Sequence, residues 1–127
     1  MKIVSDILKK KGHYFNVIHE NESVFKAITL MKTDNLSYLI VLNSLNNFLG
    51  VISERDYVHK VELDGKTAQT TIVKEIMTKN LPVVEVHETI TNCVKIIDSY
   101  KVRYLAAFDK QEFRGILTIH DFMRYHD

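Results

Sequence analysis

The chain has 127 residues, 46% of them hydrophobic and 26% charged, and a net charge of +1. The basic residues are spread along the sequence, which excludes a nucleic-acid-binding patch, and no apolar run approaches the roughly 20 residues that cross a bilayer. There is no hydrophobic signal segment at the N-terminus, and Cys93 is the single cysteine. We therefore expect a soluble, cytoplasmic protein without a nucleic acid or membrane partner.

The first half of the chain shows the pattern of a strand, a helix, two further strands and a second helix. Val17-Ile18 reads as a short strand, and apolar residues recur at helical spacing from Val24 to Met31. Residues 38–42 predict a strand, and after a turn another strand reaches Ile52. A helix is expected to begin near Ser53.

The second half repeats this order. A strand at Val83-Val84 follows the single proline, and the spacing from Ile90 to Ile97 predicts an amphipathic helix. Strands are expected at 104–108 and up to Leu117, and a helix near Thr118. Each half thus predicts a β-α-β-β-α order and a mixed α/β (α+β) fold.

The two halves are copies of one another in sequence as well. The segment from Phe48 to Tyr57 returns, 65 residues later, as the segment from Phe113 to Phe122. The repeat extends upstream, where its matching segments are Glu22-Ser23-Val24 with Glu88-Thr89-Ile90, and Val4-Ser5-Asp6-Ile7-Leu8 with Val73-Lys74-Glu75-Ile76-Met77. Ser23 and Thr89 suit helix N-caps.

These matches predict one repeat at 1–64, a polar linker at 65–72 and a second repeat at 73–127. A unit of roughly 60 residues buries a small fraction of its surface on folding. We therefore expect the two repeats to pack about a pseudo-two-fold axis, share a core and leave two related clefts where they meet.

Each copy places a hydroxyl and a carboxylate three residues apart at a predicted strand-to-helix junction: Ser53 with Asp56, and Thr118 with Asp121. Free N–H groups at a helix start attract anions, and a carboxylate can accept two hydrogen bonds from a sugar diol. The alternative is a capping box that needs no ligand. Recurrence of the pair in both copies favours the ligand-binding interpretation.

Other residues of the repeat are weaker candidates. Gly50 and Gly115 either end hairpins or allow a ligand to approach the backbone. Arg103, at a predicted strand start, could fork onto a phosphate. Arg55 and His120 occupy matching positions from which either could reach an anion.

Metal binding and catalysis have little support. The chain has six histidines, which are His13, His19, His59, His87, His120 and His126. They lack the paired spacing of zinc ligands. Nucleophile, phosphate-loop and dinucleotide motifs are also missing. An acid–base pair of His120 and Asp121 is disfavoured, because neighbouring residues at a helix start point in different directions.

The repeated Gly-aliphatic-aliphatic-hydroxyl-x-x-Asp signature resembles the CBS domain, named after cystathionine β-synthase, in its tandem arrangement as a Bateman module. The signature is Gly50-Val51-Ile52-Ser53-Glu54-Arg55-Asp56 in copy one and Gly115-Ile116-Leu117-Thr118-Ile119-His120-Asp121 in copy two. The resemblance covers essentially the whole chain.

The resemblance implies clefts between the repeats that bind AMP, ADP or ATP as an effector, with no required cofactor. Asp56 and Asp121 would hold ribose hydroxyls, Ser53 and Thr118 would contact sugar or phosphate, and Arg103 would approach phosphate. The adenine pocket would be lined, partly by backbone groups, by Val17, Ile18, Val83 and Val84. Such pairs commonly form homodimers through the helices that follow the signatures.

Copy one has Ser37 where copy two has Arg103, so we expect unequal sites, with the better phosphate site in copy two. The leading hypothesis is a non-catalytic module that senses a nucleotide and is read by a regulated protein partner. The alternative is an interaction or dimerisation module without a nucleotide, in which the signatures serve as helix caps only.

Overall fold

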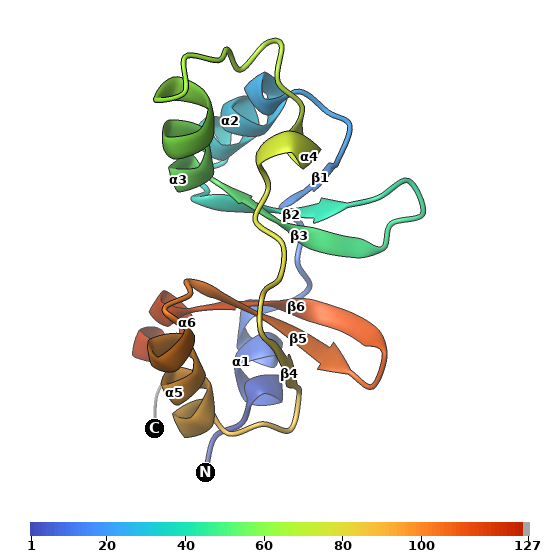
Figure 1. Ribbon diagram of the computed structural model, residues 1–127. Coiled ribbons are helices and arrows are strands. Elements are labelled where there is room, and N and C mark those ends of the chain that lie inside the picture. Colours follow the sequence, from blue (N-terminus) through green and yellow to red (C-terminus); the bar gives the residue numbers. More distant parts are fainter. Residues whose placement is uncertain (126–127) are drawn as a thin grey trace. The chain divides into compact units, whose positions relative to one another are not determined.

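The computed structural model describes residues 1–125, which form two compact units. The continuous unit is Phe15–Asn80, and the composite unit combines Met1–Tyr14 with the residues from Leu81 onward. In each unit, helices cover one face of a three-stranded sheet (Figure 1). His126, one of the histidines considered above, lies outside the described residues.

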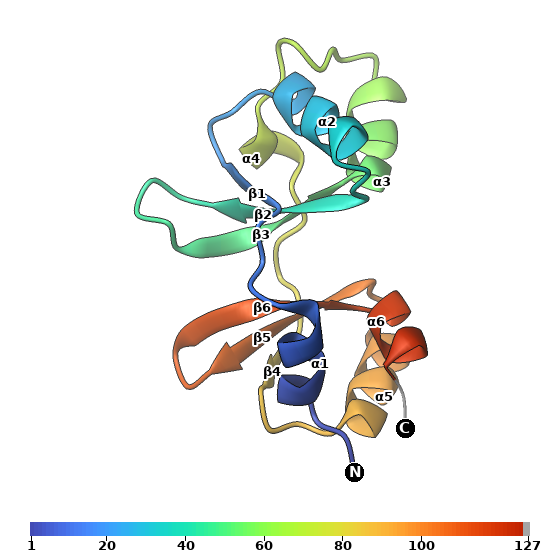
Figure 2. The same cartoon turned by 180° about the vertical axis from the view of Figure 1, so that it is seen from behind.

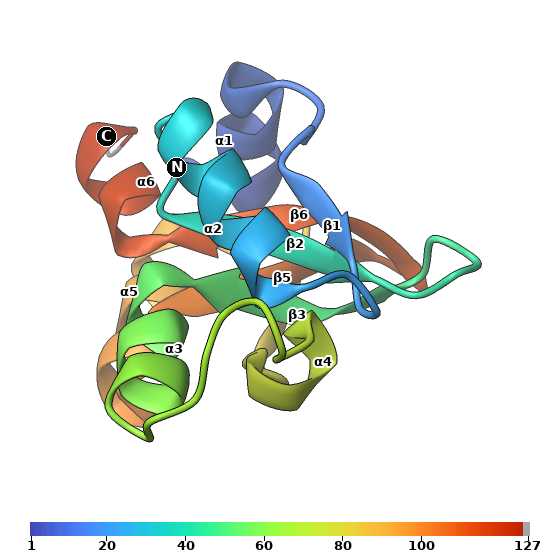
Figure 3. The same ribbon diagram turned by 90° about the horizontal axis from the view of Figure 1, so that it is seen from above.

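The continuous unit has the strand order β1-β2-β3, with β1 parallel to β2 and β2 antiparallel to β3. Helix α3 runs into one turn of π-helix, η1. The elements of the continuous unit are β1 (Val17–His19), α2 (Val24–Thr33), β2 (Tyr38–Leu42), β3 (Phe48–Ser53), α3 (Glu54–Tyr57), η1 (Val58–Glu62) and α4 (Val73–Ile76). Helices α2 and α3 lie together over the sheet, with α4 beyond β3 (Figure 3).

The composite unit repeats this topology in the order β4-β5-β6, with the same parallel and antiparallel pairings. Its elements are α1 (Val4–Lys11), β4 (Val83–Glu85), α5 (Ile90–Tyr100), β5 (Tyr104–Asp109), β6 (Glu112–Thr118) and α6 (Ile119–Arg124). Helix α1 lies on the same face of the sheet as α5 and α6 (Figure 2). Within residues 1–125, no helix is long and apolar enough to cross a membrane.

The β-α-β-β-α order predicted for each half is confirmed, and so are both helix caps. The Ser23 hydroxyl accepts the Lys26 N–H at 3.0 Å, and the Thr89 hydroxyl accepts the Asn92 N–H at 3.2 Å. The apolar face of α5 is narrower than expected, because Val94 is 39% exposed. The short helices α1 and α4 precede β1 and β4. The repeat pattern had matched these two segments without predicting a helix in either.

The compact units differ from the sequence repeats at 1–64 and 73–127, because the segments before β1 and β4 are exchanged. Helix α1 begins the first repeat in sequence but packs in the composite unit, where the Val4 N–H donates to the Glu88 carbonyl at 2.9 Å. Helix α4 begins the second repeat but packs in the continuous unit, where Val73 donates to Glu22, also at 2.9 Å.

The segment 65–72, expected to be a linker, belongs to the continuous unit. The first N–H groups of a helix have no partner within the helix. At the start of α2, Val24 donates to the Thr71 carbonyl at 2.8 Å and Phe25 donates to the Ala68 carbonyl at 3.0 Å. Both Thr71 and Ala68 are buried. This segment therefore completes the N-terminus of α2 as well as connecting the repeats.

The two signature glycines lie inside strands β3 and β6, so neither ends a hairpin. Each glycine directly follows the extra residue of a β-bulge on its own strand. At Gly50, a Cβ atom would overlap the carbonyl of Thr78. Gly115 has φ +154°, and its Cβ would lie 3.1 Å from Cδ2 of Leu8. The close approach they allow is therefore made by segments of this chain.

Each unit has its own hydrophobic core between its sheet and helices. Cys93 of α5 is fully buried in the core of the composite unit. Burial raises the pKa of its thiol from 9.0 to about 12, and the negative charge of Glu88 adds to this shift. The thiol therefore stays protonated and unreactive at neutral pH.

We predict that Cys93 reacts with a disulfide reagent at pH 8 only when the composite unit opens. Labelling should be at least about 100-fold slower in the native protein than in urea. The raised pKa also makes stability depend on pH. The contribution of Cys93 to the free energy of unfolding is complete below the pKa of the unfolded thiol, near 9, and is lost as the pH rises toward 12. Equal labelling rates in the native and unfolded states would contradict this assignment.

Candidate functional site

Both hydroxyl-x-x-Asp pairs form complete capping boxes at the junction of a strand and a helix. Asp56 accepts the Ser53 N–H at 2.9 Å, and the Ser53 hydroxyl accepts the Asp56 N–H at 3.1 Å. The corresponding distances between Thr118 and Asp121 are 2.8 and 3.3 Å. The capping role is therefore real in both copies, and binding depends on what else each carboxylate contacts.

In copy one, the chain itself occupies the carboxylate of Asp56. Its Oδ2 accepts the backbone N–H and the hydroxyl of Ser53 at 2.9 and 3.1 Å. Its Oδ1 accepts the Thr78 hydroxyl at 2.8 Å and lies 2.9 Å from Nζ of Lys60. An ionised carboxylate has about four lone-pair positions, so this set fills the acceptor capacity of Asp56. The side chain is only 7% exposed.

In copy two, the described residues bond to one carboxylate oxygen of Asp121 and not to the other. Its Oδ2 accepts the Thr118 N–H and the Lys11 ammonium, both at 2.8 Å. Lys11 also donates to the Ile116 carbonyl at 2.8 Å. Among residues 1–125, no hydrogen bond reaches Oδ1 of Asp121. This oxygen has acceptor capacity that the described residues do not use.

The donors that distinguish the two carboxylates come from the exchanged segments. Thr78 follows α4, and its backbone pairs with Val51 of β3 at 3.0 and 2.7 Å. Lys11 is the last residue of α1. Sequence reasoning missed both residues. The likeness of Val4–Leu8 to Val73–Met77 matched the segments that precede them but gave no sign that these segments change units.

The three basic candidates, Arg55, Arg103 and His120, are exposed. His120 is in the first turn of α6, directly before Asp121. Arg103 directly precedes β5, whose first residue, Tyr104, pairs with Thr118. The backbone of Arg103 therefore lies at the sheet end that carries the copy-two motif. Arg55 of α3 matches His120 of α6 and directly precedes Asp56, whose carboxylate is fully bonded.

The four valine and isoleucine candidates separate into two kinds. Ile18 and Val84 are 3% and 4% exposed and belong to the two hydrophobic cores, so only their backbone groups could meet an adenine. Val83 is 61% exposed, and Val17 is half-buried. The alternation of a strand explains this, because successive side chains point to opposite faces. For residues 1–125, no group of three histidine, cysteine or acidic side chains is arranged to hold a metal ion.

Comparison with known proteins identifies the repeated unit. A family model described as the CBS domain matches residues 4–62 and 73–127. A crystal structure of a CBS domain has 34% sequence identity and a TM-score of 0.86, covering 97% of this chain and 95% of that chain. A protein with CBS domains from Burkholderia ambifaria has 28% identity and a TM-score of 0.88, with 97% and 92% covered.

Among curated relatives, the CBS domain-containing protein CBSX3, mitochondrial, of Arabidopsis thaliana is 23% identical over 129 residues. This match covers 95% of the present chain and 63% of that protein. The chain spans from 21% to 65% of the length of the curated relatives that it matches.

The unequal bonding of the two carboxylates predicts unequal effects on stability. Asp56→Ala should lower the free energy of unfolding by about 2–3 kcal/mol, because it removes a cap and leaves buried donors unpaired. Asp121→Ala should cost about 1 kcal/mol, the usual value of a lost cap. Urea unfolding at pH 7 measures both. Asp98→Ala, at a side chain 83% exposed on α5, is the control and should change stability by less than about 0.5 kcal/mol.

The opposite order, with Asp121→Ala costing more than Asp56→Ala, would contradict the assignment of Asp56 as the structural carboxylate.

Proposed function

Since the chain belongs to the CBS domain family, we propose that it is a non-catalytic regulatory module that binds AMP, ADP or ATP at the Thr118–Asp121 motif. The observation that carries this proposal is the Oδ1 atom of Asp121, which lacks a hydrogen bond from any described residue. The same motif in copy one has no such atom. We also propose a cytoplasmic location, which suits a chain whose single cysteine is a buried free thiol.

The chemistry around Asp121 suits a nucleotide. Its Oδ1 can accept hydrogen bonds from ribose hydroxyls, and the Thr118 hydroxyl can contact sugar or phosphate. Arg103 lies beyond the Tyr104–Thr118 pair and offers a planar guanidinium to phosphate. His120 adds a second exposed side chain that can donate to an anion.

Copy one is the weaker site, both in its carboxylate and in the residue that would face the phosphate. Asp56 would have to give up bonds to Thr78 or Lys60 before it could accept a ribose hydroxyl. Ser37 stands where copy two has Arg103, and its carbonyl accepts the N–H of Glu54 at 3.2 Å. We therefore propose one principal nucleotide per chain, at copy two.

Lys11 provides a route from the nucleotide to the rest of the composite unit. Its ammonium joins the last turn of α1 to both Asp121 and the Ile116 carbonyl. A nucleotide phosphate beside Asp121 would compete for this ammonium and change how firmly α1 is held. The resulting shift can be no larger than the difference in nucleotide affinity between the two states. A protein partner would read the position of α1.

We predict that millimolar AMP or ATP raises the melting temperature and that Asp121→Asn removes most of this shift. Ligand at about 100 times its dissociation constant adds about 2.7 kcal/mol of stability. Arg103→Ala should reduce the shift for AMP and ATP and leave that for adenosine unchanged, because only phosphate needs the guanidinium. Differential scanning fluorimetry measures each shift against the variant's own nucleotide-free curve.

The exposed Asp98→Ala variant should keep the full nucleotide shift. A melting curve that stays unchanged with AMP, ADP and ATP in the native sequence would remove the nucleotide proposal.

We also propose that the module forms a homodimer through the segments that follow the two signatures. These segments expose apolar side chains, since Val58 is 40% exposed, Leu63 71% and Met123 66%; Ile119, inside the second signature, is 37% exposed. A contiguous exposed apolar patch marks an interaction surface, and we propose that these side chains contribute to one in the dimer. This association would also serve the alternative role of the chain as an interaction module.

Introducing a charge at Met123 or Val58 should therefore produce monomers. Met123→Asp and Val58→Asp are expected to weaken self-association at least tenfold, or about 1.4 kcal/mol. Leu45→Asp, at a hairpin residue 78% exposed, is the control and should leave association unchanged. Sedimentation equilibrium measures the constants. A native protein that stays monomeric at the highest concentration measured, or equal effects of all three changes, would exclude this interface.

A further inference from the structure

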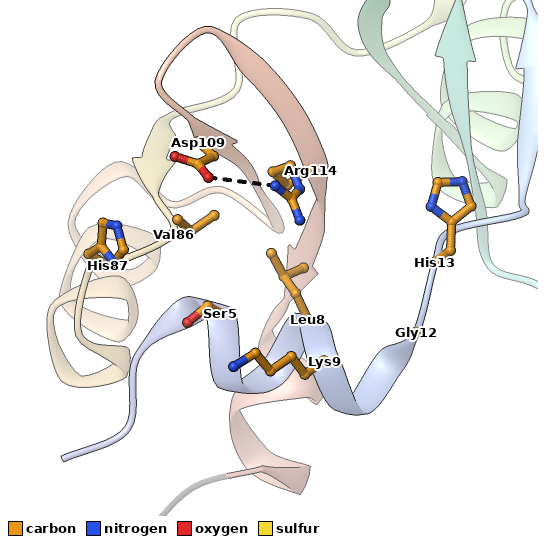
Figure 4. Close-up of a pocket in the computed structure, with 9 residues that line it drawn as sticks. All are labelled: Ser5, Leu8, Lys9, Gly12, His13, Val86, His87, Asp109 and Arg114. Carbon is orange, nitrogen blue, oxygen red and sulfur yellow. Dashed lines mark ion pairs between the residues drawn. The ribbon is translucent and has the colours of Figure 1, made fainter.

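The composite unit contains a pocket that the signature motif does not use. It has a volume of about 430 Å³ and lies between α1, the turn after β4 and the β5–β6 hairpin (Figure 4). Small-molecule sites have volumes of roughly 300–1,000 Å³. The pocket is therefore large enough for a small organic ligand.

This pocket lies at the opposite end of the sheet from the copy-two motif. Asp109, at the pocket, pairs with Glu112 at one end of the β5–β6 ladder, whereas Tyr104 pairs with Thr118 at the other end. The five steps from Tyr104 to Asp109, at about 3.3 Å each, separate the two ends by roughly 17 Å. The pocket and the proposed nucleotide motif are therefore different sites.

Arg114 is the main cation of the pocket, and most of its donors are unused. It is the extra residue of the β-bulge, since Ala107 pairs with Gly115 and Phe108 with Phe113. A bulge re-aims the side chain that it carries. The guanidinium has five N–H donors, and its one ion pair within residues 1–125 is a long contact of 3.5 Å from Nη1 to Oδ2 of Asp109.

The other polar side chains of the pocket also suit an anion. Lys9 of α1 brings a second permanent cation, and His87 and Ser5 bring further hydrogen-bond donors. Leu8 and Val86 supply an apolar surface between them (Figure 4). Asp109 is the acidic residue of the lining and is already paired with Arg114.

The other repeat does not carry these charges. The continuous unit has the same topology and the same register. By that register and the repeat alignment, the counterparts of Lys9, His87, Asp109 and Arg114 are Thr78, Asn21, Asn43 and Leu49. These four counterparts are neutral, whereas the counterparts of Ser5 and Val86 are Lys74 and Glu20, so the two copies place their charges at different positions.

We propose that this pocket binds a phosphate monoester with a small organic body. Arg114 forks onto the phosphate as its pair with Asp109 loosens, and Lys9 adds a point charge. The organic part rests against Leu8 and Val86. This assignment is independent of the nucleotide at Asp121.

The test is an NMR titration of the intact chain with glycerol 3-phosphate, with inorganic phosphate and glycerol as separate arms. Amide signals of Ser5, His87 and Arg114 should shift with saturation, while those of Thr118 and Asp121 stay in place. Glycerol alone should give no shift, and inorganic phosphate should bind more weakly than the ester.

Two variants take their residues from the other repeat, which protects the fold. Arg114→Leu should weaken binding at least about tenfold, and Asp109→Asn should tighten it about threefold by freeing the guanidinium. Arg103→Ala, at the nucleotide motif, should leave binding unchanged. The proposal is overturned if glycerol 3-phosphate moves no pocket amide up to about 10 mM, if Arg114→Leu binds like the native sequence, or if Arg103→Ala is the damaging change.

Discussion

The structure depends on a hydrogen bond that each signature aspartate receives from a segment belonging, in sequence, to the other repeat. The Thr78 hydroxyl donates to Asp56 in the continuous unit, and the Lys11 ammonium donates to Asp121 in the composite unit. These contacts, together with the capping boxes, fix the start of the helix after each signature. Gly50 and Gly115 make room for the same incoming segments.

The same constraint makes two similar motifs chemically unequal. The Thr78 hydroxyl and the Lys60 ammonium together complete the bonding of Asp56, whereas Lys11 contacts a single oxygen of Asp121. One repeat therefore uses its aspartate to hold itself together, and the other retains acceptor capacity. The copies also differ at the pocket of the composite unit, where the counterparts of Lys9 and Arg114 are Thr78 and Leu49.

Much of this fold follows from local patterns. The caps at Ser23 and Thr89, the paired strands and the helix starts at Ser53 and Thr118 depend on neighbouring residues, and the sequence predicted them. The exchange of α1 and α4 depends on contacts between distant segments, which no local spacing encodes. For the same reason, the carboxylates of Asp56 and Asp121 looked equivalent in sequence. The sequence also did not predict the contact of Lys11 with Asp121 or the position of Arg114 at the pocket.

If Asp121 has an oxygen for a ligand and Asp56 does not, only the Asp121 carboxylate should respond when a nucleotide binds. Carbon-13 NMR of the aspartate carboxyl groups during an AMP titration tests it directly, because each carboxylate reports its own hydrogen bonding. We expect a saturable shift of the Asp121 signal and a stationary Asp56 signal. A shift of Asp56 with Asp121 unmoved would contradict it.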